Sequence, residues 1–103
     1  SNASKKVAAE YLTKYEQKFG TRSTFGGHAY DSYLLLSKAV PEALKKAKPG
    51  TKEFRAALRD ALERTTVPAT HGVYAMTAND HKGFDNRARV MVKIENGKWV
   101  LQK

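Results

Sequence analysis

The stretch from His71 to Leu101 decides the fold, and it ends with Val90-Met91-Val92-Lys93-Ile94-Glu95-Asn96-Gly97-Lys98-Trp99-Val100-Leu101. Branched apolar residues recur at every second position from Val90 to Ile94, which is the period of a half-buried strand. The pair Asn96-Gly97 then favours the positive φ angles of a two-residue type I′ turn. This turn sets three cross-strand pairs, which are Glu95–Lys98, Ile94–Trp99 and Val92–Leu101. We therefore predict a C-terminal hairpin with one apolar face, in which Trp99 is buried beside Ile94.

The residues before this hairpin predict three helices within positions 4–63. Tyr11, Tyr15 and Phe19 recur every four positions and form one stripe of an amphipathic helix. Gly20 follows the last apolar position, as glycine commonly does after a helix. We therefore expect the first helix to run from Ser4 to Phe19.

A loop over residues 21–27 leads to the second helix, which we expect from about His28 into the forties. Pro41 lacks a backbone N–H group and disfavours helical geometry in the residue before it, which predicts a break or kink near Val40. The third helix is expected to begin after Thr51, whose side chain suits the N-cap position. Its predicted core stripe consists of Phe54, Leu58 and Leu62.

A short strand is predicted from Gly72 to Met76, and a polar loop from Thr77 to Asn86 separates it from the hairpin. The expected fold class is α/β, or α+β for this segment taken alone, with three helices followed by the strand and the hairpin. We expect a single domain over residues 4–103. Residues 1–3, Ser1-Asn2-Ala3, are typical of the remnant left by tag removal and do not enter the fold prediction.

The composition limits the possible functions. The 103 residues suffice for one small domain, and the absence of cysteine excludes disulfides and thiolate chemistry. The sequence contains no run of 18 apolar residues, so it predicts no membrane-spanning helix. The net charge of +9 permits binding to nucleic acid, but the lysines and arginines are spread along the chain, which is typical of a solvated surface.

The sequence predicts no catalytic group, no metal site and no cofactor. His71 and His81 lie ten positions apart with Asp80 beside one of them. This set falls short of the three or four converging ligands that zinc requires. No residues resemble a nucleophile with its base and orienting partner, so we do not expect an enzyme.

Three segments carry a family resemblance through their order and spacing. They are Tyr11-x3-Tyr15-x3-Phe19-Gly20, then Ala29-Tyr30-Asp31-Ser32, and then Gly72-Val73-Tyr74-x-Met76-Thr77-x2-Asp80-His81-x-Gly83 with the hairpin after it. Together they resemble the C-terminal part of the periplasmic solute-binding proteins of the branched-chain amino-acid type. The resemblance covers essentially every residue after the first three. Proteins of that family are much longer, so the resemblance implies that this chain corresponds to a fragment.

The resemblance implies a binding protein that delivers a small molecule to an ABC transporter from the periplasm. In that family, two Rossmann-like lobes close by a hinge motion on a ligand in the cleft between them. The implied ligand is a branched-chain amino acid, a related amino acid or an aromatic acid. The implied protein partner is the ABC transporter permease.

The resemblance marks Phe25 and His28 as ligand-binding residues. Phe25 lies five positions before Tyr30, where the family places an aromatic residue against the ligand. The alternative for Phe25 is a loop aromatic that anchors the helix to its neighbour. His28 becomes a polar group at the rim of the cleft. Its alternative is an exposed residue at the helix start, with its side chain near Asp31.

The alternative function is a small basic nucleic-acid-binding module, because single strands bind to aromatic and basic side chains. The hairpin supplies such a set in Arg87, Arg89, Lys93, Lys98 and Trp99. We expect no nucleic-acid binding, since the pairing register turns Trp99 inward.

We expect the chain by itself to form a homodimer by sharing strands or exchanging its hairpin. The strand over residues 72–76 lacks the parallel neighbours of a Rossmann-like lobe, and open strand edges invite pairing with another chain. A two-stranded hairpin is also marginally stable in water.

Overall fold

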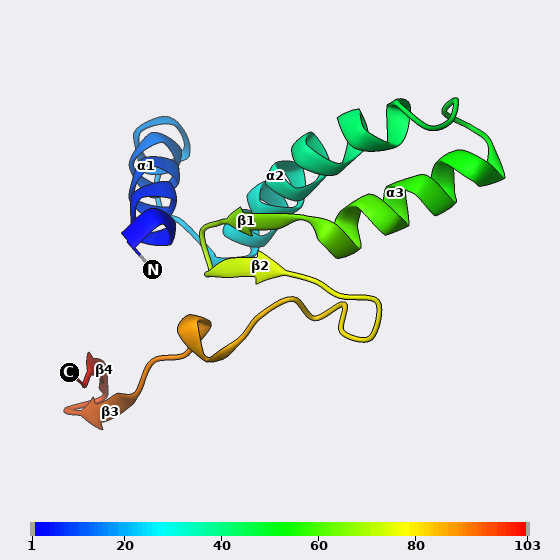
Figure 1. The fold of residues 1–103 in the computed structure, drawn as a ribbon. Helices are drawn as coiled ribbons and strands as arrows, with labels where there is room; N and C mark the ends of the chain where they lie inside the picture. The colour runs from blue at the N-terminus through cyan, green and yellow to red at the C-terminus, as the bar shows by residue number, and fades with distance from the viewer. Residues whose placement is uncertain (1, 103) are drawn as a thin grey trace.

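The computed structural model describes residues 2–102. Its elements in chain order are helix α1 (Asn2–Phe19), helix α2 (Thr24–Leu44), helix α3 (Lys52–Arg64), strand β1 (Thr66–Pro68), strand β2 (Val73–Ala75), a 3-10 turn (Asn86–Ala88), strand β3 (Val92–Glu95) and strand β4 (Lys98–Leu101). Helices α2 and α3 lie side by side, α1 lies near the start of α2, and the hairpin β3–β4 lies away from the helices (Figure 1). The predicted fold class is confirmed.

The predicted end of the first helix is also confirmed. Gly20 has a φ of +81°, and its N–H group donates to the carbonyl oxygen of Glu16 over 3.1 Å. Glycine adopts this left-handed geometry at little cost, which ends α1 after Phe19. At the other end, α1 begins at Asn2 rather than at the predicted Ser4. No helix within residues 2–102 combines the length and the apolar character that a membrane span needs.

Helix α2 differs from its prediction at its start and at Pro41, whereas its end at Leu44 agrees with the prediction. It begins at Thr24 rather than near His28, and it continues through Pro41 to Leu44, so the predicted break near Val40 is wrong. Proline removes only one helical hydrogen bond, and α2 is held beyond that point by its packing against α3. Four alanines on the facing sides of these two helices are buried, namely Ala39, Ala43, Ala57 and Ala61.

The cap of α3 is the one predicted from the sequence. The hydroxyl oxygen of Thr51 accepts a hydrogen bond from the backbone N–H of Phe54 over 3.1 Å. The predicted core stripe is only half buried at Phe54, Leu58 and Leu62. The alanines beside this stripe lie deeper, because small side chains let the two helix backbones approach each other.

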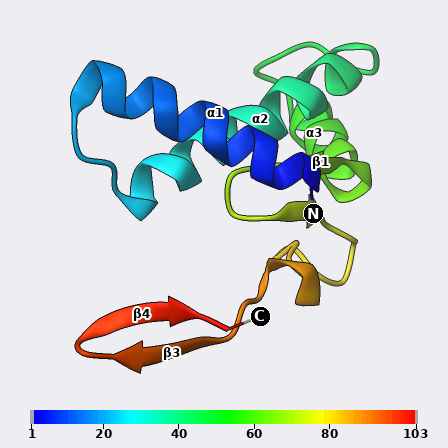
Figure 2. The ribbon, with the colours of Figure 1, turned by 90° about the vertical axis from the view of Figure 1, so that its left-hand side faces the viewer.

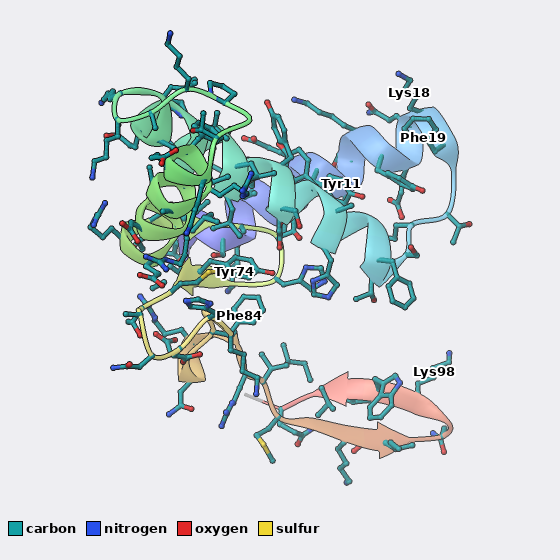
Figure 3. All side chains as sticks on the ribbon, turned by 90° about the vertical axis from the view of Figure 1, so that its right-hand side faces the viewer. Tyr11, Lys18, Phe19, Tyr74, Phe84 and Lys98 are labelled. Carbon is teal, nitrogen blue, oxygen red and sulfur yellow. The ribbon has the colours of Figure 1, made fainter. Side chains whose placement is uncertain are left out.

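The strand predicted over residues 72–76 is observed as β2, but its partner is not a parallel strand. It pairs antiparallel with β1, which the sequence prediction missed, in the register Thr66–Ala75, Val67–Tyr74 and Pro68–Val73. Beside this ladder lies the core cluster, which contains Leu35, Val67, Ala69 and Tyr74 with Leu34, Leu62, Met76 and Phe84 packed against it. The rings of Tyr74 and Phe84 lie 4.2 Å apart, which ties β2 to the loop that follows it (Figure 3).

The hairpin has the predicted register, with the pairs Val92–Leu101, Ile94–Trp99 and Glu95–Lys98. Asn96 and Gly97 have φ angles of 50° and 73°, as a type I′ turn requires. The predicted burial of Trp99 beside Ile94 is wrong, because their exposed fractions are 74% and 63%. The reason is placement: no helix in residues 2–102 covers the hairpin, which extends away from the rest of the chain (Figure 2).

Candidate functional site

A buried carboxylate links the first half of α2 to the turn between β1 and β2. Asp31 has no exposed surface. One of its oxygens, Oδ1, accepts the backbone N–H of Thr70 over 2.7 Å, and Oδ2 accepts the backbone N–H of His71 over 3.2 Å. The ring nitrogen Nδ1 of His71 lies 3.2 Å from the same Oδ2. Charge-assisted bonds of this kind are stronger than neutral ones, so Asp31 fixes the β1–β2 turn against the helix.

A glycine allows this close approach. A Cβ atom added to Gly27 would lie 2.7 Å from Cε1 of His71 and 2.9 Å from Oγ1 of Thr70. Both distances are shorter than van der Waals contact. The first turn of α2 therefore lies directly against the turn that Asp31 holds, and any larger residue at position 27 would push the two apart.

The ring of His71 forms a base for a second imidazole. The rings of His28 and His71 are stacked, with centroids 3.7 Å apart and planes inclined by 4°. His71 is also held from the side, since its Nδ1 lies 3.0 Å from Oγ1 of Thr70. His28 is exposed, whereas His71 is partly buried. The pair thus presents one imidazole to solvent on top of another that the fold keeps in place.

A pocket of about 330 Å³ lies beside this pair, between α1, the start of α2 and the β1–β2 turn. Its lining consists of Ala8, Tyr11, Leu12, Arg22, Ser23, Thr24, Gly27, Thr70 and His71. Burial raises the pKa of Tyr11 above its ordinary value, and the nearby Tyr15 and Asp31 raise it further. A tyrosine hydroxyl is neutral near neutral pH with or without this shift, and it can donate a hydrogen bond.

The N-terminus of α2 opens onto the same pocket. Ser23 occupies the N-cap position, but its side chain does not cap the helix, and the first turn contains no acidic residue. The N–H groups at a helix start carry partial positive charge and favour anions. Arg22 adds a positive charge at this edge, where it forms an exposed ion pair with Glu16 over 2.9 Å. The pocket entrance is thus suited to a carboxylate.

The two predicted ligand-binding residues lie on this first stretch of α2. Phe25 is in the helix, not in a loop, and 82% of it is exposed. Within residues 2–102, Phe25 therefore does not anchor α2 to a neighbouring element. His28 is exposed, as its alternative stated, but it lies on His71, which in turn contacts Asp31. Neither Phe25 nor His28 lines the pocket itself.

The sequence analysis missed the residues that support His28. The sequence places Asp31 in a family motif and near the side chain of His28, and it places His71 in an incomplete set of zinc ligands, but it does not predict a contact between Asp31 and His71. A signal for Asp31 was present, because an acid at position 31 shares a helix face with the apolar residues Leu34 and Leu35. An acid on such a face needs a buried hydrogen-bonding partner. Nothing in the sequence indicated that this partner was the turn at His71.

A second pocket, of about 260 Å³, lies on α3 away from this site. It is lined by Arg55, Leu58, Arg59, Leu62, Glu63, Met76 and His81. The ring nitrogen Nε2 of His81 is 2.9 Å from the carboxylate of Glu63, whereas His71 contacts Asp31. The two histidines therefore have different acidic partners. Within residues 2–102, no three or more histidine or acidic side chains form a group that could hold a metal ion.

Comparison with solved structures gives matches over nearly the whole chain. One is an extracellular ligand-binding receptor from Rhodopseudomonas palustris, with 45% identity, a TM-score of 0.85, and coverage of 98% of this chain and 29% of the receptor. Another, from strain HaA2 of that organism, has 44% identity and a TM-score of 0.86 over 100% of this chain and 30% of the receptor. A further receptor from strain HaA2 has 38% identity and a TM-score of 0.77, covering 96% of this chain and 28% of the receptor.

This chain therefore spans less than a third of the length of the receptors that it matches. No protein-family model matches it, and comparison with curated proteins gives no match. At this level of identity, agreement over 96–100% of the chain includes the sequence as well as the fold. The resemblance seen in the sequence motifs is thereby confirmed.

Proposed function

Because this chain belongs to the family of extracellular ligand-binding receptors, we propose that it forms one wall of a solute-binding site. Its role is binding, not catalysis. The observation that carries the proposal is the first part of α2. There an 82% exposed phenylalanine, Phe25, and the exposed imidazole of His28 lie at a helix N-terminus without acidic residues.

These groups suit a small acid with an apolar body. The helix N-terminus attracts the carboxylate, and Phe25 covers the apolar part of the ligand. His28 supplies a polar contact at the edge. Branched-chain amino acids, related amino acids and aromatic acids all have this combination of a carboxylate and an apolar body. We propose this ligand class.

The whole receptor closes its lobes around the ligand and passes it to the permease of an ABC transporter. We propose a periplasmic location for this receptor. Support comes from the similarity to extracellular ligand-binding receptors over 98–100% of the chain. The chain alone lacks the opposite wall of the cleft, so the ligand gains its full contacts only when the remaining receptor is present.

The test uses a segment-swap receptor, in which this chain replaces the corresponding part of a matched Rhodopseudomonas palustris receptor. Calorimetric titration with leucine, phenylalanine and benzoate identifies the ligand that binds. Burying a phenylalanine side chain is worth about 1.5–3 kcal/mol, so Phe25→Ala should weaken binding about 10- to 150-fold. Phe19→Ala is the matched control, because Phe19 is also exposed, at 65%. It lies at the C-terminal end of α1 and does not line the pocket (Figure 3).

The control variant should bind like the unmodified segment-swap receptor. Equal binding by Phe25→Ala and the unmodified receptor would remove Phe25 from the site. If a folded segment-swap receptor binds none of the three ligands, the proposed ligand class is wrong.

For the chain by itself, we also propose a homodimer that shares strands or exchanges the hairpin. The support is the exposed apolar face of the hairpin, where Ile94, Trp99 and Leu101 are 60–74% exposed. Burial of this face drives association, and the net charge of +9 opposes it less as salt is added. Sedimentation at near-physiological salt should show a dimer at tens of micromolar. A single monomeric species with a cooperative melt would refute the dimer.

A nucleic-acid-binding hairpin is the second candidate function, favoured by one observation. The inward orientation of Trp99 argued against it in the sequence, whereas Trp99 is 74% exposed and follows Lys98. An exposed indole beside a cation suits stacking on unpaired bases. Binding of the chain to random single-stranded oligonucleotides at two salt concentrations tests it. Binding that weakens steeply with salt would support this candidate, and no binding at low salt would exclude it.

A further inference from the structure

Asp31 is a fully buried acid, and its side-chain hydrogen bonds within residues 2–102 lead to two neighbouring residues that line the pocket. Those residues are Thr70 and His71, and His71 is also the base of the stack with His28. Asp31 itself does not line the pocket. We infer that Asp31 is a positioning residue of the ligand site, which acts through His71 to orient the ring of His28. This inference rests on the proposed function.

The chemistry of the carboxylate determines how His71 is held. An ionised carboxylate accepts hydrogen bonds and donates none, so a hydrogen bond between Nδ1 of His71 and Oδ2 of Asp31 requires the hydrogen to be on Nδ1. Oγ1 of Thr70 lies 3.0 Å from the same Nδ1 and can accept from the same hydrogen. Asp31 therefore sets both the tautomer and the plane of the His71 ring. A partner behind a histidine commonly has this effect at metal sites.

The plane of His71 then sets that of His28. The two planes are inclined by only 4° and the centroids are 3.7 Å apart, so a rotation of the lower ring would separate the faces. Gly27 closes the other side, because its position lies against Cε1 of His71. His28 is exposed and in contact with a fixed ring, so it is ordered before a ligand arrives. A side chain that is already ordered loses less conformational freedom on binding.

Asp31→Asn distinguishes this role from that of a simple link between helix and turn. Asparagine keeps one acceptor oxygen, which can still accept the N–H of Thr70. Its NH₂ group then faces the backbone N–H and the Nδ1–H of His71. All of these groups are donors, so no hydrogen bond forms between them. The link to Thr70 is kept, whereas the hydrogen on Nδ1 of His71 is no longer favoured. The variant therefore changes the ring of His71 more than it changes the connection between α2 and the β1–β2 turn.

The first measurement is NMR of the chain without ligand. In the unmodified chain, we expect the hydrogen of His71 on Nδ1 and the ring protons of His28 upfield of their positions in His71→Ala. In Asp31→Asn, the hydrogen should move to Nε2 of His71, and the His28 protons should shift toward their His71→Ala positions. Unchanged signals of both rings in a folded Asp31→Asn chain would overturn the inference.

His71→Phe provides a second variant if Asp31→Asn does not fold. It keeps an aromatic ring at position 71 but has no nitrogen to face Asp31. We expect the ring protons of His28 to lose most of their upfield shift, and a full upfield shift would show that packing alone orients the stack.

The second measurement is ligand affinity in the segment-swap receptor. Asp31→Asn should weaken binding about tenfold, at the lower end of what loss of an orienting partner costs at metal sites. Unchanged affinity together with altered rings would overturn the positioning role. If the NMR changes occur but the unmodified segment-swap receptor binds no ligand, the proposed function fails, and with it the assignment of Asp31 to a ligand site. The measured tether between Asp31 and His71 would then be structural only.

Discussion

Gly27→Ala should destabilise the chain, although the same change stabilises most helices. Gly27 is a buried residue inside α2, where alanine favours the helix over glycine by up to about 1 kcal/mol. If helix propensity alone decided the outcome, the variant would be more stable. The sign of the effect therefore tests whether the contact between α2 and the β1–β2 turn is as close as the structure shows.

The magnitude follows from the two atoms that a new methyl group would meet. It would lie 2.7 Å from Cε1 of His71 and 2.9 Å from Oγ1 of Thr70. Neither residue can move freely, because Asp31 accepts the backbone N–H groups of both. Overpacking at a well-packed position typically costs about 1–3 kcal/mol, and a fixed neighbour favours the upper half of this range. After subtracting the gain in propensity, we expect a net loss of about 1–2 kcal/mol.

Urea unfolding followed by circular dichroism measures this loss. On heating, the melting temperature should fall by roughly 4–16 °C, since 1 kcal/mol corresponds to about 4–8 °C in a domain of this size. Ala29→Gly is the matched control, because Ala29 is an exposed position of the same helix and reports propensity alone. It should cost about 1 kcal/mol or less. A Gly27→Ala variant more stable than the unmodified chain would contradict the close contact.

Three further predictions concern stability and affinity. Trp99→Ala should change the free energy of unfolding of a monomeric chain by less than about 1 kcal/mol, because the side chain is 74% exposed; a loss of 3 kcal/mol or more in urea unfolding would mean that Trp99 is buried. Thr51→Ala should lower the free energy of unfolding by about 1 kcal/mol in the same assay, because the hydrogen bond from the N–H of Phe54 is lost; no change would show that this cap does not stabilise α3. Calorimetry of the chain alone should detect no micromolar binding of leucine, phenylalanine or benzoate, since only one wall of the cleft is present; micromolar binding would show that this wall suffices.

Features that depend on neighbouring residues in the sequence were predictable. The hairpin register follows from the Asn96-Gly97 turn, and the end of α1 follows from Gly20, because both depend on which residues tolerate positive φ. The exposure of Trp99 was not predictable in this way. It depends on what covers the hairpin, and within residues 2–102 no helix does so (Figure 2).

Features that depend on contacts between distant segments were missed. Gly26 and Gly27 suggested a loop, yet they lie in α2, where a side chain at position 27 would meet His71. Strand β1 has only three residues and ends in Pro68, which is too short for an alternating pattern. The ligand-binding residues Phe25 and His28 came from the family resemblance and stay predictions. The link from Asp31 to His28 runs through His71, which lies 40 positions after Asp31 in the sequence.

NMR of the isotopically labelled segment-swap receptor, titrated to saturation with its ligand, tests most directly whether the start of α2 forms a wall of the binding site. We expect the largest changes in chemical shift at Thr24–His28 and at His71. The pocket on α3 provides the internal control, and Leu58 and Met76, which line it, should change little. Largest changes at that pocket or on the hairpin, with Phe25 and His28 unaffected, would contradict the proposed site.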